Sequence, residues 1–150
     1  AVVTTHRHAD HWQGLRRVVD QTGAQVIAHP LDAEALPVSV TRTVTDGEEI
    51  VFGAARVTVI HLRGHTPGSI ALLYAADVDA PHLFTGDSLF PGGPGNTRGN
   101  RRDFTLLMDD LEEKIFGRLP DATWVYPGHG RDTTLGAERP HLAEWRARGW

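Results

Sequence analysis

The stretch VVTTHRHADHW, residues 2–12, decides how the rest of the chain is interpreted. Its β-branched residues 2–5 predict the end of a strand, and a cluster of polar side chains follows on the loop that leaves this strand. The cluster consists of His6, His8, Asp10 and His11. Alternate residues of an extended segment point to the same side, so the first two imidazoles can reach one ion while the other two side chains face a second. A solvated polar loop is the alternative, since short motifs also arise by chance.

Composition narrows the class of protein. A chain of 150 residues with 40% hydrophobic residues is expected to form one globular domain over residues 1–150. Its net charge of -4 does not indicate a nucleic-acid or membrane-surface protein, and no apolar run has the length of a membrane span. The absence of cysteine excludes disulfides and thiolate ligands, and it agrees with a cytoplasmic location. Nine histidines favour site chemistry.

Hydrophobic patterning and turn residues predict a mixture of strands and helices. We expect strands at 2–5, 25–28, 49–53, 55–62, 69–75, 82–85 and 123–126, an extended segment at 38–44, a turn at 77–81, a loop at 91–102, and helices at 12–22, 31–36, from Asp103 and from Ala137. Asp103 is the expected N-cap of its helix. The fold class is therefore α+β, without repeats or linkers.

Three further segments each place a polar residue in a glycine turn just after a strand. They are Gly64–Ser69, Gly86–Ser88 and Pro127–Gly130, which carry His65, Asp87 and His129. Sites in α/β proteins collect at such strand ends, and glycine lets the backbone approach a crowded centre. Taken singly, each of these residues is as easily explained by a turn or by a surface histidine.

Together, these segments resemble the signatures of the metallo-β-lactamase fold superfamily. Residues 5–11 match its Thr-His-x-His-x-Asp-His signature. Residues 64–69, 84–90 and 126–130 match the segments that carry a third histidine, a bridging aspartate and a last histidine. The resemblance covers residues 1 to about 145 and implies an αββα sandwich with metals at one edge between its two sheets.

The resemblance also implies a dinuclear metal site. One cation would be held by His6, His8 and His65, the second by Asp10, His11 and His129, and Asp87 would bridge both. Nitrogen and oxygen ligands suit zinc above all, with iron or manganese as alternatives.

Within the superfamily the sequence looks most similar to the glyoxalase II-like hydrolases. The aspartate at position 87 separates it from the true β-lactamases, which lack this bridging residue. The expected reaction is hydrolysis of a small thioester, in which a metal-bridging hydroxide attacks the carbonyl and Asp10 orients this nucleophile. A thiolate leaving group, with a pKa near ~8.5, needs little proton donation. We expect no nucleic-acid or membrane partner, and the oligomeric state is left open.

Three arginines follow the expected bridging aspartate on the predicted loop. Arg98, Arg101 and Arg102 are candidates for binding substrate carboxylates, and a solvated basic loop is the alternative. Glyoxalase II enzymes hold glutathione with an added helical domain, for which a chain ending at Trp150 has little room. Among the other histidines, His61 is a candidate for orienting a ligand. Trp12, Tyr126 and Trp145 are expected in the core.

Other functions remain open on the same residues. A persulfide dioxygenase with one iron shares these motifs, and a lactonase or phosphodiesterase would use the same metals. A non-enzymatic metal-binding domain is disfavoured, because a structural site needs only four ligands on one closed ion.

In the superfamily several strands precede the first motif, and the sequence lacks them. We therefore expect an N-terminally incomplete sandwich with exposed sheet edges and apolar faces, and poor stability of residues 1–150 alone.

Overall fold

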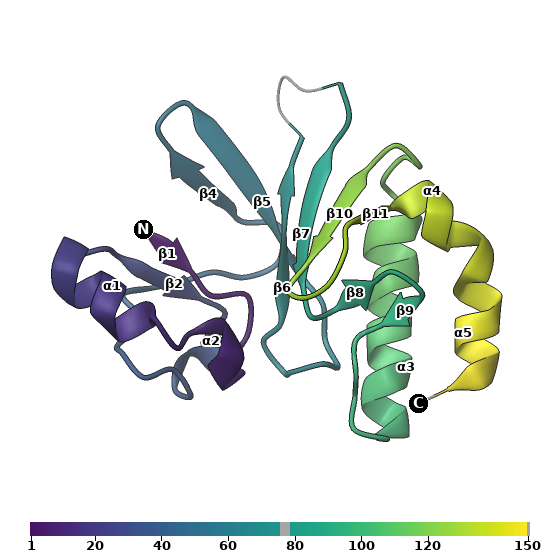
Figure 1. The fold of residues 1–150 in the computed structure, drawn as a ribbon, viewed down its shortest axis with the longest axis horizontal. Coiled ribbons are helices and arrows are strands. Elements are labelled where there is room, and N and C mark those ends of the chain that lie inside the picture. The colour runs from purple at the N-terminus through teal and green to yellow at the C-terminus, as the bar shows by residue number, and fades with distance from the viewer. Residues whose placement is uncertain (76–78, 150) are drawn as a thin grey trace.

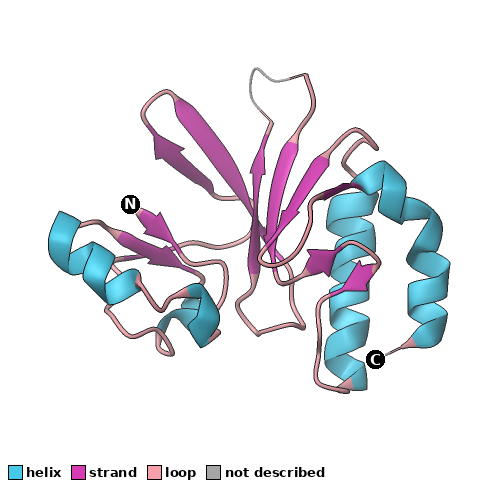
Figure 2. Ribbon diagram, in the orientation of Figure 1, coloured by secondary structure: helices cyan, strands magenta, loops and turns pink. Residues whose placement is uncertain are grey.

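The computed structural model describes residues 1–75 and 79–149, which form four layers. Two β-sheets lie face to face, with helices on both outer sides (Figures 1 and 2). The first helices along the chain flank one sheet, and the last helices cover the other. This arrangement is the αββα sandwich that the sequence predicts. Within the described residues, no helix is both long and apolar enough to cross a membrane.

The small sheet is built from the first third of the chain. Its three strands, β1 (Val2–Val3), β2 (Val26–Ala28) and β3 (Arg42–Thr43), are parallel and lie in that order. Between them the chain forms the short 3₁₀ helix η1 (Ala9–His11) and the helices α1 (Leu15–Thr22) and α2 (Pro30–Ala33). Helix α1 ends where Gly23 adopts φ 64°, a left-handed conformation that glycine reaches without strain.

The large sheet has six strands in the order β11-β10-β7-β6-β5-β4. These strands are β4 (Glu49–Phe52), β5 (Ala55–His61), β6 (Ile70–Tyr74), β7 (His82–Gly86), β10 (Trp124–Pro127) and β11 (Thr133–Thr134). Neighbours are antiparallel except for β7 and β10, which are parallel. The pair β8 (Leu89–Phe90) and β9 (Gly93–Pro94) follows β7 as a separate ribbon.

The second half of the chain supplies the helices that cover the large sheet. They are α3 (Arg101–Asp110), its π-helical continuation η2 (Leu111–Phe116), α4 (Leu135–Glu138), the 3₁₀ turn η3 (Arg139–His141) and α5 (Leu142–Arg148). The apolar face predicted for α3 is buried: Leu107, Met108, Leu111 and Ile115 have no exposed surface, and Phe104 is nearly buried. They pack against Leu83 and Val125 of the sheet. A second core lies between the sheets, around Ile27, Val44 and Val59.

The start of α3 corrects the sequence analysis. The N-cap is Asn100, whose side chain accepts hydrogen bonds from the backbone amides of Arg102 and Asp103. Asp103 was wrongly predicted as the cap; it lies in the first turn, where a carboxylate is favoured by the helix dipole. Arg101 and Arg102 are therefore helical and do not lie on a loop. The predicted loop also contains β9, and the turn predicted at 77–81 falls partly outside the described residues.

Aromatic side chains of the large sheet are exposed on the face that looks toward the small sheet. Phe84 pairs in register with Leu72, which packs into the core between the sheets, so both point to this face. Phe84 stacks on Tyr126 with ring centroids 5.0 Å apart, and Trp124 points the same way two residues earlier. Phe84 and Trp124 are 44% and 45% exposed. The three short strands of the small sheet leave this aromatic patch uncovered.

This patch predicts self-association of residues 1–150, because exposed contiguous apolar surface favours contact between copies. Light scattering is expected to show oligomers, and the double variant Phe84→Ser/Trp124→Ser is expected to shift the average mass toward that of a monomer. Phe52→Ser is the control, because Phe52 is 55% exposed outside the patch. A wild-type monomer, or an equal shift in the control, would contradict the prediction.

Candidate metal centre

Four segments that lie far apart in the sequence bring seven His and Asp side chains together. The segment that leaves β1 and ends in η1 carries four of them, and the loops after β5, β7 and β10 carry one residue each. The seven are His6, His8, Asp10, His11, His65, Asp87 and His129, in three overlapping groups whose possible ligand atoms lie within 4.8 Å of one another. These are the residues that the sequence analysis singled out as ligands, and the fold places all of them at one edge of the sandwich.

The first group consists of three histidines. Nδ1 of His8 lies 2.9 Å from Nε2 of His65. The ring of His6 stands edge-on to both, with centroid distances of 4.9 Å and 4.8 Å. Three imidazole nitrogens thus face one small volume, as a cation with nitrogen ligands requires.

The second group is more exposed and contains a carboxylate. Nε2 of His129 lies 3.0 Å from Nε2 of His11 and 3.0 Å from Oδ2 of Asp10. The side chains of His129 and Asp10 are about half exposed, whereas that of His11 is 13% exposed. This group is therefore the more solvent-accessible of the two.

Asp87 lies between the two groups. Its Oδ1 is 3.2 Å from Nε2 of His11, and its Oδ2 is 3.7 Å from Nε2 of both His65 and His129. One carboxylate thus presents an oxygen to members of each group. This is the position that a bridging ligand would occupy.

Polar atoms in the centre lack protein partners. Among the described residues, Nε2 of His6 and Oδ1 of Asp87 are buried without a hydrogen bond. Buried polar atoms are almost always paired, because an unpaired one costs roughly 1–3 kcal/mol. Both atoms point into the cluster, so coordination of a cation accounts for them. The donor set fits a divalent metal.

Electrostatics favour the neutral forms of His6, His8 and His65. Burial, together with the nearby imidazoles of His11, His65 and His8, lowers the pKa of His6 to about 3. Burial also lowers the pKa of His8, and the positive charge of Arg98 lowers it as well. Burial likewise lowers the pKa of His65. Although desolvation raises the pKa of Asp10, its own backbone amide and the nearby histidines lower it on balance. Neutral imidazoles and an ionised carboxylate are the forms that bind metals.

Two glycines permit this close approach. A Cβ atom at Gly128 would lie 2.3 Å from Oδ1 of Asp87 and 2.4 Å from Cε1 of His11. A Cβ at Gly95 would lie 1.7 Å from the backbone oxygen of Asp87. Any larger residue at either position would displace the aspartate that joins the two groups.

Two ligands form hydrogen bonds outside the cluster, and the one to His65 fixes its tautomer. Nδ1 of His65 lies 2.9 Å from the backbone oxygen of Asn96, so it donates there and leaves Nε2 free to coordinate. Nη2 of Arg98 donates to Nε2 of His8 over 3.2 Å. Arg98 has φ 56°, a left-handed conformation that costs energy for a side chain of this size, and its amide donates to the side chain of Asn96.

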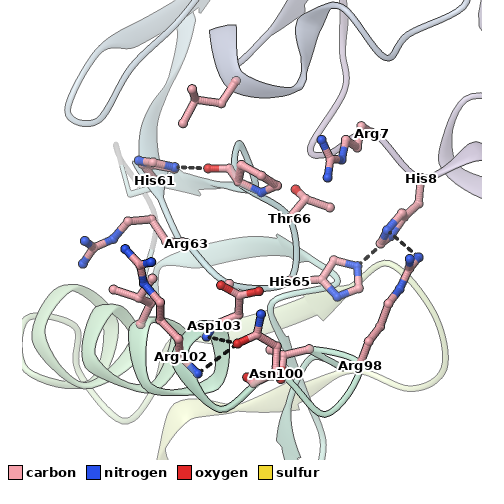
Figure 3. A pocket seen from close by; sticks show the side chains of 15 residues that line it. Arg7, His8, His61, Arg63, His65, Thr66, Arg98, Asn100, Arg102 and Asp103 are labelled. Carbon is pink, nitrogen blue, oxygen red and sulfur yellow. Dashed lines mark hydrogen bonds between the residues drawn. The ribbon is translucent and has the colours of Figure 1, made fainter.

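A cavity of about 640 Å³ adjoins the first group and is lined by guanidinium groups (Figure 3). Arg7, Arg63, Arg98 and Arg102 line it together with His8 and His65. Of the three arginines singled out from the sequence, Arg98 and Arg102 thus reach the cavity, whereas Arg101 is exposed and is absent from its lining. Arg7 and Arg63 were not among the sequence-based candidates, although Arg7 lies inside the histidine motif itself.

The remaining histidines and aromatic residues take other positions. His61 stacks on His29 with centroids 4.0 Å apart, and its Nε2 lies 2.8 Å from the backbone oxygen of Pro67. It thus braces the turn that carries His65 without touching the ligand. Trp145 is buried as predicted, whereas Trp12 and Tyr126 are only half-buried.

Comparison with known proteins places this geometry in a family. Residues 1–129 match the Metallo-beta-lactamase superfamily. The chain is 39% identical to a hydroxyacylglutathione hydrolase from Polaromonas sp. over 85% of its length, although it spans only 47% of that relative. It is also similar to the crystal structure of the BLEG-1 B3 metallo-beta-lactamase, with a TM-score of 0.81, 29% identity, and coverage of 97% of this chain and 76% of that one. ETHE1 from Myxococcus xanthus has a TM-score of 0.78 and 31% identity, with coverage of 97% and 62%.

The glycine packing predicts a specific loss of metal. Gly128→Ala is expected to weaken metal binding at least ~10-fold, as is typical for displaced partners of a metal ligand. The measurement is metal content after dialysis against a graded series of chelator concentrations. Gly14→Ala is the matched control, because nothing lies within 4 Å of a Cβ there. Unchanged metal binding in Gly128→Ala would contradict this description of the centre.

Proposed function

Because the chain belongs to the metallo-beta-lactamase superfamily, we propose that it is a metal-dependent hydrolase of thioesters that uses two divalent cations. The observation that carries this proposal is the position of Asp87 between two groups of three ligands. A single structural cation would need only one closed group of four. The relative named hydroxyacylglutathione hydrolase supports the choice of thioesters.

The proposed ligand sets follow from the two groups. His6, His8 and His65 would hold one cation, and Asp10, His11 and His129 would hold the other, with Asp87 available to both. We favour zinc, with iron or manganese as alternatives. When bound, the two cations supply a lowered pKa for water and positive charge for a developing oxyanion.

Asp10 is the proposed catalytic residue of the chain. Its Oδ2 lies near His129, and about half of its side chain is open to solvent. Its lowered pKa keeps the carboxylate ionised at neutral pH. An ionised carboxylate at the solvent side of the cluster can accept a hydrogen bond from the attacking water and so orient it.

The cavity favours a leaving group that needs no proton. Guanidinium groups keep their protons at neutral pH, so the arginines that line the cavity cannot act as general acids. A thiolate, with a pKa near ~8.5, leaves without protonation more readily than an amine. Thioesters therefore suit this site better than amides.

The arginines also support an anionic substrate. The guanidinium of Arg63 is neutralised by the buried carboxylate of Asp110, at 2.7 Å. Within the described part of the chain, no carboxylate pairs with Arg98 or Arg102. Coordination through Nδ1 would place the proton of His8 on Nε2, which then no longer accepts from Arg98. The guanidinium would be released toward the cavity, where a substrate carboxylate can bind.

Two other functions use the same residues. A persulfide dioxygenase with one iron is supported by the likeness to ETHE1. A lactonase, or another ester hydrolase, would employ the same cations and the same cavity. We further propose a cytoplasmic location and a small-molecule substrate, since the chain has no cysteine and the cavity is of small-molecule size.

Metal analysis combined with a substrate panel separates these functions. The hydrolase is expected to contain two cations per chain and to cleave acyl thioesters that bear a carboxylate, with release of thiol measured by a colorimetric reagent. One iron per chain, with oxygen uptake in the presence of glutathione persulfide, would replace this proposal with the dioxygenase. Cleavage of lactones without thioesters would replace it with the lactonase.

Arg98 is predicted to select anionic substrates. Arg98→Ala is expected to raise KM for a carboxylate-bearing thioester by ~10-fold with a smaller change in kcat, since a charge-assisted hydrogen bond contributes about 1.5–3 kcal/mol. A neutral thioester is expected to show no such change. Arg101→Ala is the control on the neighbouring helix. Equal effects on neutral and anionic substrates would refute the assignment.

A further inference from the structure

We propose that Asp32 is a positioning residue that holds the three histidines of the first cation in place. Asp32 lies in α2, outside the ligand cluster, and is 1% exposed. The proposal rests on the proposed function only in that the first group binds a cation.

The carboxylate of Asp32 joins the two loops that carry these histidines. Its Oδ2 accepts a hydrogen bond of 3.0 Å from the backbone amide of Arg7, the residue between His6 and His8. The same oxygen accepts a bond of 2.5 Å from the hydroxyl of Thr66, which directly follows His65. One buried side chain is therefore bonded next to all three ligands.

The second oxygen extends this connection along the turn. Oδ1 of Asp32 accepts from the backbone amide of Gly68 at 2.9 Å. Because the hydroxyl of Thr66 donates to Asp32, it accepts from the hydroxyl of Ser69, 2.7 Å away. Ser69 in turn accepts from the backbone amide of Thr66 at 3.1 Å. The turn after His65 thus bonds one carboxylate through the hydroxyl of Thr66 and the backbone amide of Gly68.

The backbone is shaped for this contact. A Cβ at Gly68 would lie 2.8 Å from both the backbone nitrogen and Cγ of Asp32. Glycine at this position lets the turn lie directly against the aspartate. Three neutral donors bind the carboxylate, and the closest approach of the guanidinium of Arg7 is 3.9 Å. Asp32 is therefore engaged in fixing backbone, in contrast to the direct ion pair between Arg63 and Asp110.

The contacts of Asp32 are confined to one half of the centre. In the portion of the chain that the structure describes, the hydrogen bonds of its side chain reach Arg7, Thr66 and Gly68, whereas Asp10, His11 and His129 form none with it. If Asp32 only stabilised the fold, its replacement would weaken the binding of both cations equally. If Asp32 positions the three histidines, its replacement would weaken the binding of the first cation alone.

Cobalt titrations of isolated sites test this distinction. The His129→Ala background leaves the first group intact, and the His65→Ala background leaves the second. Asp32→Asn replaces an oxygen that accepts hydrogen bonds with an amide that donates them. We expect it to weaken Co²⁺ binding at least ~10-fold in the first background and less than about twofold in the second. The visible absorption of Co²⁺ gives both dissociation constants.

Two further variants keep the test decisive. Asp110→Asn is the matched control, because Asp110 is equally buried at 1% but bonds Arg63 and Lys114, neither of which directly adjoins a ligand in the sequence. It is expected to lower the free energy of unfolding without changing either dissociation constant. Thr66→Val removes one donor to Asp32 with little change in volume. If Asp32→Asn fails to fold, the Co²⁺ affinity of Thr66→Val tests the inference in its place.

The outcomes separate this inference from the proposed function. Wild-type Co²⁺ affinity in both Asp32→Asn and Thr66→Val overturns the inference, as does equal weakening of both sites or equal weakening by Asp110→Asn. Selective weakening of the first site supports it, even if the wild-type protein cleaves no thioester. Absence of thioester cleavage by the wild-type protein would overturn the proposed function and leave this inference standing.

Discussion

Packing of imidazoles around one carboxylate is the constraint on which the rest of the structure depends. Nitrogen atoms of His8 and His65, and of His11 and His129, face each other at hydrogen-bond distance. Nε2 of His6 and Oδ1 of Asp87 are buried without partners among the described residues. Such a cluster is unfavourable by itself, because desolvated lone pairs go uncompensated. Cations that accept those lone pairs account for the cluster. The glycine turns and the buried Asp32 bring the ligands close enough to bind the same cations.

The candidate ligands could be predicted from sequence because each sits in a short local pattern, and these patterns together resemble the signatures of one superfamily. Residue spacing on an extended segment placed His6 beside His8, and strand–glycine turns marked His65, Asp87 and His129. The strands and the buried face of α3 followed from hydrophobic periodicity for the same local reason.

Residues whose roles depend on tertiary contacts could not be predicted in this way. Asp32 lies 34 residues before its partner Thr66, and no local pattern connects them. Arg7 and Arg63 reach the cavity only because the two sheets close on each other. The helix start was misplaced for a smaller reason: Asn100 and Asp103 are both good capping residues, and only the backbone geometry distinguishes them.

Crystals of the zinc-loaded protein would show whether two cations share Asp87. An anomalous difference map recorded at the zinc edge is predicted to show two peaks per chain. One should contact His6, His8 and His65, the other Asp10, His11 and His129, and Asp87 should reach both. A single peak, or two peaks of which only one contacts Asp87, would contradict the account.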